Sequence, residues 1–197
     1  MRVRYCCLLA AAALCLGCGK AERNEAVTLC KVLQQKRADF TAANAVEKDF
    51  VATVRTWDES IIAKGGGRGA ELTQNGGAAK DLAASAGTIT TQLSQIREAI
   101  NNVSLHEEYP QGIRTDLINK IMRRQRLLQE VRVALQDSAA GFADLGQSRA
   151  YNGDTYPGGI DKLNGLVQGY QDPDDALGKA VADLKAKYKL TDADLGS

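Results

Sequence analysis

The sequence predicts an all-α protein that folds as an up-down-up-down four-helix bundle with coiled-coil-like packing. Four long segments place apolar residues three and four positions apart, the spacing of a helix with one apolar stripe, or seam. Glycine- and proline-containing breakers separate these segments. Few runs of β-branched and aromatic residues alternate with period two, and the chain has only three prolines, so a β-sheet is not expected.

The first two segments show this spacing. In the first, the seam runs through Leu33, Phe40, Ala43, Val46, Phe50, Val54, Trp57 and Ile61. In the second, gaps of four and three alternate strictly through Leu82, Ala86, Ile89, Leu93, Ile96, Ile100 and Val103. A repeat of this kind advances about 3.5 residues per turn, so its seam winds slowly around the helix. It is best buried against another helix at a shallow crossing angle.

The third segment lies between Ile113 and Leu145. Its outer row has residues seven apart, at Ile121, Leu128, Leu135 and Phe142. Its inner row contains Leu117, Val131 and Leu145, with Arg124 and Ser138 as polar interruptions. The segment also carries a basic cluster at Lys120, Arg123, Arg124, Arg126 and Arg132. These side chains spread around much of the helix, so we expect a solvated face with intrahelical ion pairs. A patch for anionic lipid or an acidic partner is the alternative.

The fourth segment is interrupted by a proline. Its apolar positions are Ile160, Leu163, Val167 and Tyr170, followed by Leu177, Val181, Leu184 and Tyr188. Pro173 lies between the two sets, and a proline ring inside a helix clashes with the carbonyl one turn earlier. We therefore expect a new helix to start there, with Asp172 as its N-cap and Pro173 at its first position.

The breakers predict three connections. The first combines Gly65–Gly69 with Asn75-Gly76-Gly77 and gives a loop of about 15 residues, from Gly65 to Ala79. The second contains Tyr109-Pro110, and the third contains Asn152-Gly153 and Pro157-Gly158-Gly159. Short connections favour antiparallel neighbours. The first loop is long for a helical bundle, and we interpret it either as a mobile connection or as the working part of the protein.

The N-terminus has the organisation of a secretory signal peptide. Arg2 and Arg4 precede an apolar run from Cys6 to Leu16, and the small residue Gly17 stands directly before Cys18. The run is shorter than the roughly 20 apolar residues that span a bilayer. We therefore assign residues 1–17 to a signal peptide rather than to a transmembrane helix.

The end of this segment, Leu14-Cys15-Leu16-Gly17-Cys18, resembles the lipobox of bacterial lipoproteins. The resemblance covers residues 1–19 and implies that Cys18 is acylated with palmitate-type chains after cleavage. Residues 18–25 would then form an acylated short tether, and residues 26–197 the helical bundle domain. Gly19, rather than aspartate, implies the outer membrane facing the periplasm by analogy with lipoprotein sorting. The alternative is a secreted protein in which Cys18 is merely a small residue near the cleavage site.

The charge and the cysteine content limit the partners and the disulfide bonds that we expect. Without Arg2 and Arg4, the 25 basic residues fall to 23 against 24 acidic ones, so the mature chain lacks the basic excess of a nucleic-acid binder. We therefore expect no nucleic acid as a partner. Apart from Cys18, the mature domain contains one cysteine, Cys30, in an apolar helical stretch. It cannot form an internal disulfide, and we expect it to be buried.

The sequence contains no recognisable catalytic or metal-binding pattern. His106 is the only histidine, and paired histidine or cysteine ligand motifs are missing. We expect His106 to lie at a solvated helix C-terminus. No enzyme, cofactor or metal site is therefore expected. The sequence favours a lipid-anchored structural or protein-interaction module of the cell envelope, with an envelope protein as its partner. The alternatives are a binding protein that holds a small apolar ligand between helices and, for the assembly, a homo-oligomer formed through the same seams.

Overall fold

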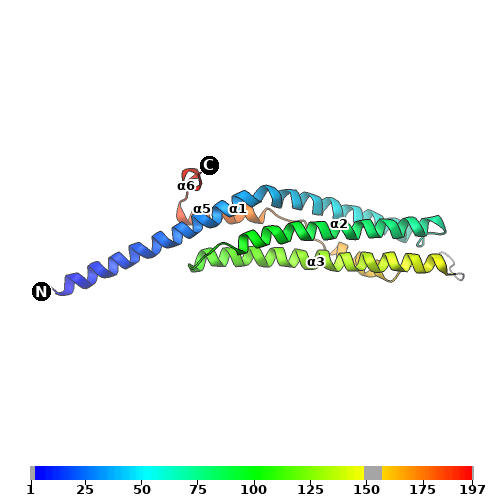
Figure 1. The fold of residues 1–197 in the computed structure, drawn as a ribbon, viewed down its shortest axis with the longest axis horizontal. Coiled ribbons are helices and arrows are strands. Elements are labelled where there is room, and N and C mark those ends of the chain that lie inside the picture. The colour runs from blue at the N-terminus through cyan, green and yellow to red at the C-terminus, as the bar shows by residue number, and fades with distance from the viewer. Residues whose placement is uncertain (1–2, 149–156, 197) are drawn as a thin grey trace. The chain divides into compact units, whose positions relative to one another are not determined.

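The computed structural model describes residues 3–148 and 157–196, and their side chains from residue 19 onward. Over these residues it contains six α-helices and no strand, which confirms the all-α prediction (Figure 1). The helices are α1 (Val3–Ala63), α2 (Ala70–Asn101), α3 (Glu108–Gln147), α4 (Gly159–Gln168), α5 (Ala176–Tyr188) and α6 (Asp192–Leu195). Arg2 and Asn152-Gly153, which supported two of the predictions above, lie outside the described residues. None of the described helices has a stretch long and apolar enough to cross a bilayer.

The chain forms two compact units. Unit 1 contains the described residues of Met1–Ala38, Ile96–Lys120 and Asp175–Ser197. Unit 2 contains those of Asp39–Gln95 and Ile121–Asp174. Helices α1, α2 and α3 therefore each contribute residues to both units, whereas α4 belongs to unit 2, and α5 and α6 belong to unit 1.

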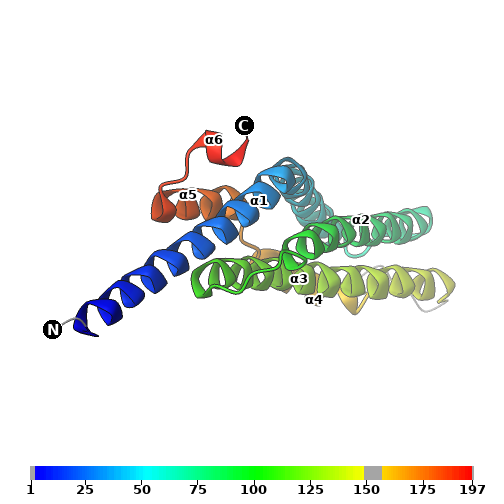
Figure 2. The same ribbon diagram turned by 60° about the vertical axis from the view of Figure 1, so that its left-hand side comes forward.

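The core of unit 2 is built from the predicted seams. α2 and α3 lie side by side in both views (Figures 1 and 2), and Ala86, Ile89 and Leu93 of α2 are fully buried. The outer row of α3 is also buried, at Ile121, Leu128, Leu135 and Phe142. A cluster of Ile61, Leu72, Phe142 and Ile160 joins all four helices of the unit, and Trp57 packs edge-on against Phe142. The coiled-coil spacing therefore identified the buried faces of these helices.

One predicted core position of α1 is wrong. Val46 is 47% exposed, and the neighbouring Glu47 is buried in its place, with 1% of its surface exposed. The buried row passes from Ala43 through Glu47 to Val51 and Val54. This is still a helical spacing, so the error concerns only which residue type occupies the core position.

The predicted loop from Gly65 to Ala79 is also wrong, because α2 begins at Ala70. Leu72 and Ala79 are buried seven positions apart and extend the α2 seam toward its N-terminus. A Cβ at Gly76 would lie 3.5 Å from the Cβ of Phe142, an ordinary van der Waals distance, so Gly76 faces α3 within the helical part of α2. Packing therefore keeps the glycine-containing segment helical. The chain turns at Gly65, Gly66, Gly67 and Gly69, which all have positive φ angles.

The expected restart in the fourth segment occurs, but at a different residue. α4 ends at Gln168 and α5 begins at Ala176, with Asp175 rather than Asp172 as its N-cap. The Asp175 carboxylate accepts a hydrogen bond from the backbone N–H of Gly178 at 2.9 Å and pairs with Arg37 at 2.6 Å. These bonds lower the pKa of Asp175, with the Arg37 hydrogen bond as the main cause. Pro173 therefore lies in the connection and not at the first position of the helix.

The core of unit 1 includes Cys30, the one cysteine whose side chain the structure describes. Cys30 is fully buried beside Leu29 and Leu33 on α1, which confirms its predicted burial. Burial raises the pKa of its thiol to about 11. The thiolate is the nucleophilic form of cysteine, so Cys30 is a packing residue and not a reactive thiol.

Candidate functional site

The predicted lipidation residue, Cys18, lies within the helical span of α1. Its side chain is outside the described residues, as are those of Arg4 and the apolar run before it, so the signal peptide and its acylation stay predictions. Residues 19–25, which follow Cys18, continue the helix into the buried stretch that begins at Ala26. The expected short tether is therefore helical in the structure.

Three charged residues in this stretch bond to other parts of unit 1. Glu22 accepts a hydrogen bond from the Tyr188 hydroxyl at 2.6 Å, and Arg23 pairs with Asp194 of α6 at 2.8 Å. Glu25 accepts hydrogen bonds from the backbone N–H groups of residues 106 and 107, at 2.8 to 2.9 Å. The segment after Cys18 is thus held by α5, α6 and the α2–α3 connection.

Two of these bonds change the ionisation of their partners. The pKa of Asp194 falls to about 2, first because the backbone N–H of Thr191 donates to its carboxylate and then because Arg23 does. Burial, followed by the hydrogen bond and negative charge of Glu22, raises the pKa of Tyr188. Asp194 is therefore ionised, and Tyr188 remains a neutral hydrogen-bond donor, at any physiological pH.

His106 is exposed, as predicted, but it does not lie at the C-terminus of a helix, because α2 already ends at Asn101. This residue is exposed between α2 and α3, and its ring Nε2 lies 3.4 Å from the Ser104 hydroxyl oxygen. Its backbone N–H, rather than its imidazole, makes the contact with Glu25 described above. Local sequence patterns do not indicate this contact, because it joins residues 81 positions apart.

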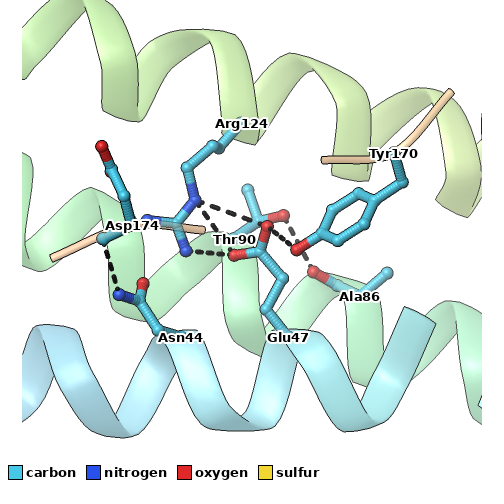
Figure 3. A network of polar contacts seen from close by, with 7 residues as sticks. All are labelled: Asn44, Glu47, Ala86, Thr90, Arg124, Tyr170 and Asp174. Atoms are coloured by element: carbon cyan, nitrogen blue, oxygen red, sulfur yellow. Dashed lines mark hydrogen bonds and ion pairs between the residues drawn. The ribbon is translucent and has the colours of Figure 1, made fainter. Parts of the chain in front are cut away.

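Unit 2 contains a partly buried polar cluster formed by Asn44 and Glu47 of α1, Arg124 of α3 and Tyr170, which follows α4 (Figure 3). The Arg124 Nε donates to Glu47 Oε2 at 3.1 Å, and its Nη2 also contacts that oxygen. The Tyr170 hydroxyl donates to Glu47 Oε1 at 2.8 Å. Asn44 donates to the backbone carbonyl of Asp174 at 3.1 Å. Both carboxylate oxygens of Glu47 therefore have donors from the chain itself.

The positions of these residues along their helices explain why they meet. Asn44 and Glu47 lie three positions apart on α1 and so share a face. Arg124 is the polar interruption in the inner row of α3 and lies 5.0 Å from the centroid of the Phe40 ring. Its side chain is only 17% exposed, so the expectation of a solvated face is wrong for this member of the basic cluster. Burial, followed by the nearby Glu47 carboxylate, raises the pKa of Tyr170.

The Glu47 carboxylate of this polar cluster is already engaged by other side chains of the protein. A general base needs a free lone pair directed at a substrate, but the two Glu47 oxygens already accept hydrogen bonds from Arg124 and Tyr170. A second polar contact in the same unit has the same character. The Gln125 side-chain amide donates to the Thr90 carbonyl at 3.2 Å and to the Ser94 hydroxyl at 2.6 Å. Such paired buried groups fix which residues of adjacent helices meet.

Asp58 is the buried acid that lacks full pairing. It lies on α1, 2% exposed, and its Oδ1 has no hydrogen-bond partner among the described residues. Burial raises its pKa to about 6, and the negative charges of Glu59 and Asp161 add to this effect. Because its ordinary pKa is near 3.8, the folded chain holds this proton over a pH range in which the unfolded chain has lost it.

We therefore expect Asp58 to make stability fall with rising pH. A group with a raised folded-state pKa stabilises the fold below its unfolded pKa and loses that contribution as the pH passes its folded pKa. Between pH 4 and pH 7, the free energy of unfolding of the wild type should fall by about 2 kcal/mol relative to Asp58→Asn, which has no proton to lose. Urea titrations of both proteins at the two pH values measure this difference. Parallel pH profiles would contradict the prediction.

The volumes of the cavities in unit 2 show how much room there is for a ligand between its helices. The apolar space lined by residues of α1, α3 and α4, including Phe50, Leu128 and Val167, has a volume of about 10 Å³. That is room for about one water molecule. A wider groove of about 470 Å³ runs between α2 and α3, lined by small residues such as Gly76, Ala139 and Gly146. Among the side chains that the structure describes, no group of three or more histidine, cysteine, aspartate or glutamate residues could hold a metal ion.

Comparison with known proteins gives no assignment: no family model, curated protein or solved structure matches this chain. The functional conclusion therefore depends on the residues and contacts of the chain itself.

Proposed function

We propose that this protein is a lipid-anchored bacterial lipoprotein that acts as a structural or protein-interaction module of the cell envelope. In this proposal Cys18 carries the acyl chains, and the protein resides at the outer membrane and faces the periplasm. Its partner is another envelope protein. The observation that carries the proposal is the lipobox-like sequence ending at Cys18, together with the next turns of α1, which are bonded to the rest of unit 1.

The helical geometry after Cys18 supports a close attachment. At a rise of about 1.5 Å per residue, the eight residues from Cys18 to the first buried position, Ala26, span about 12 Å. Glu22, Arg23 and Glu25 fix this stretch to unit 1. Acyl chains on Cys18 would therefore hold unit 1 next to the lipid surface, and two or three such chains would make the attachment long-lived.

A binding or structural role also agrees with how the buried polar groups are used. Glu47, Arg124 and Gln125 all bond to groups of the same chain, as residues that hold adjacent helices together do. We further propose an up-down-up-down bundle in which α4 and α5 together take the place of the expected fourth helix. The alternative function, holding an apolar ligand between helices, has less support: the apolar space between α1, α3 and α4 is only about 10 Å³, and the wider groove between α2 and α3 also has the polar residues Thr73, Lys80 and Gln147 in its lining.

The proposal predicts that Cys18→Ser abolishes membrane attachment. Cells expressing the wild type should incorporate radiolabelled palmitate into the protein, and nearly all of it should sediment with membranes. Cys18→Ser should incorporate no label, because serine lacks the sulfur atom that is alkylated. Cys30→Ala is the matched control: it also removes a cysteine, but a fully buried one, and should retain both label and membrane attachment. Identical fractionation of Cys18→Ser and wild type would contradict the proposal.

The same strains test the interaction role. After crosslinking in intact cells, the wild type should yield a stoichiometric envelope protein, and Cys18→Ser should lose it because the chain no longer reaches the membrane. Consistent recovery of the wild-type chain alone would count against an interaction module.

A further inference from the structure

A cavity of about 430 Å³ lies within unit 1, close to the proposed anchor along α1. It is bounded by Glu22 of α1, Lys187 of α5 and the first turns of α3. The α3 residues are Glu108, Tyr109, Gly112 and Ile113. Its volume is in the range of small-molecule sites, and its lining combines an aromatic ring, a branched apolar side chain and carboxylates.

The cavity already contains a cation supplied by the protein. The Lys187 ammonium lies 3.4 Å from the centroid of the Tyr109 ring and 5.4 Å from that of the Tyr188 ring. The two rings are 6.0 Å apart and nearly perpendicular, at 71°. Glu22 completes the surroundings, since its Oε1 lies 3.8 Å from the same ammonium. Aromatic faces grouped around an ammonium are how proteins bind organic cations.

The ion pair that Lys187 makes with Glu22 is nevertheless weak. The distance from Lys187 to Glu22 is near the upper limit of an ion pair, and the lysine side chain is 41% exposed. Exposed ion pairs of this kind contribute little, and the flexible lysine stem loses rotamer freedom when the ammonium is held in place. Rotation of the stem would place the ammonium in water and leave the face of Tyr109 open.

The remaining lining would then favour a cation and disfavour an anion. Without the Lys187 ammonium, the charged groups of the cavity are the carboxylates of Glu22 and Glu108. The Tyr109 face and Ile113 provide surface for methyl and methylene groups, whereas a small metal ion would need several oxygen ligands at once. We propose that this cavity binds an organic ammonium compound, which displaces Lys187 from the Tyr109 ring. The site does not depend on acylation of Cys18.

Calorimetric titration of the full chain in nonionic detergent, with choline as the probe, tests this site. Choline should bind saturably, and its neutral carbon analogue 3,3-dimethylbutan-1-ol should bind at least about 10-fold more weakly, because it lacks the charge that the rings and carboxylates recognise. Equal affinity for the two compounds, or no binding of choline, would overturn the proposal.

Two substitutions move choline affinity in opposite directions. Lys187→Met removes the internal competitor but keeps most of the stem, so choline should bind about 2- to 5-fold more tightly.

Gly112→Leu should fill the cavity and weaken choline binding at least about 10-fold. A Cβ at Gly112 meets no atom within 4 Å, and leucine is the better helix former, so the fold should be retained. Tyr109→Phe keeps the ring and should bind as the wild type does. Weaker binding by Lys187→Met, or unchanged binding by Gly112→Leu, would contradict the assignment.

The ammonium group could belong to a lipid headgroup or to a free compound, and competition distinguishes these sources. Phosphatidylcholine added to the detergent micelles should reduce choline binding if the headgroup enters the cavity. If it does not, the site takes free ammonium compounds. Phosphatidylglycerol has no ammonium group, and competition by this lipid equal to that by phosphatidylcholine would overturn the proposed specificity.

Discussion

Replacing Arg124 with methionine should lower the free energy of unfolding by about 3 kcal/mol at pH 7, the scale on which removing one partner destabilises a buried ion pair. Methionine retains much of the apolar stem but removes the guanidinium. The Glu47 carboxylate, 1% exposed, would then keep only the Tyr170 hydroxyl as a donor. A buried charge without its counter-charge cannot recover the hydration it lost on folding. Urea denaturation of wild type and variant measures the difference.

The double variant Glu47→Leu/Arg124→Met separates the value of the pair from the cost of breaking it. Buried ion pairs are often replaced by apolar residues with little loss, because both desolvation penalties disappear together. We expect the double variant to unfold within about 1 kcal/mol of the wild type, well above either single variant. Arg123→Met removes an exposed neighbouring arginine and should change stability by less than about 0.5 kcal/mol. A double variant as unstable as Arg124→Met alone would show that the pair itself stabilises the fold.

The faces of the long helices could be predicted from sequence because apolar spacing depends on geometry that every helix shares. Ile89, Leu93, Leu128 and Leu135 are buried as that spacing predicts. Charged residues in the core escape this reasoning. Glu47 and Asp58 occupy buried positions of α1, yet a carboxylate in sequence is normally assigned to solvent. A signal existed on the partner helix, where Arg124 interrupts an otherwise apolar row.

The helix boundaries were harder to predict, because tertiary contacts decided them. Gly76 and its neighbour Gly77 are poor helix formers, yet α2 extends through them because Leu72 and Ala79 are buried on the same seam. Likewise, Asp172 precedes a proline and is a good local N-cap. The actual cap is Asp175, which also pairs with Arg37, 138 positions away. Local propensity contains no information about such a distant partner.

The two candidate sites also differ in how far the sequence alone could reveal them. The lipobox-like stretch before Cys18 is contiguous, so it can be recognised without a structure. The cavity around Lys187 is not contiguous: it joins Glu22 near the N-terminus, Tyr109 in the middle of the chain and Lys187 near the C-terminus. Each of these residues is unremarkable in its own segment. Only the fold shows that an ammonium, an aromatic face and a carboxylate meet there.

The backbones of α3 and α4 approach each other closely at Gly159. Gly159 is buried at the start of α4. A Cβ at this position would lie 2.5 Å from the Ser138 hydroxyl oxygen and 2.7 Å from the Ser138 backbone nitrogen, and still closer to the Ala134 carbonyl. Ser138 is fully buried, and its hydroxyl already donates to the Ala134 carbonyl at 2.8 Å. Relief of the clash would therefore require movement of helix backbone and not only of a side chain.

Gly159→Ala should consequently lower the free energy of unfolding by about 2 to 3 kcal/mol, the usual scale of overpacking in a filled core. Gly165→Ala in the same helix is the matched control, because a Cβ there meets no atom within 4 Å. It should stabilise the protein by about 0.5 to 1 kcal/mol, since alanine is the better helix former. Chemical denaturation of both variants therefore tests the sign as well as the size of the effect. If Gly159→Ala were also stabilising, α4 would not pack against Ala134 and Ser138 as closely as the structure shows.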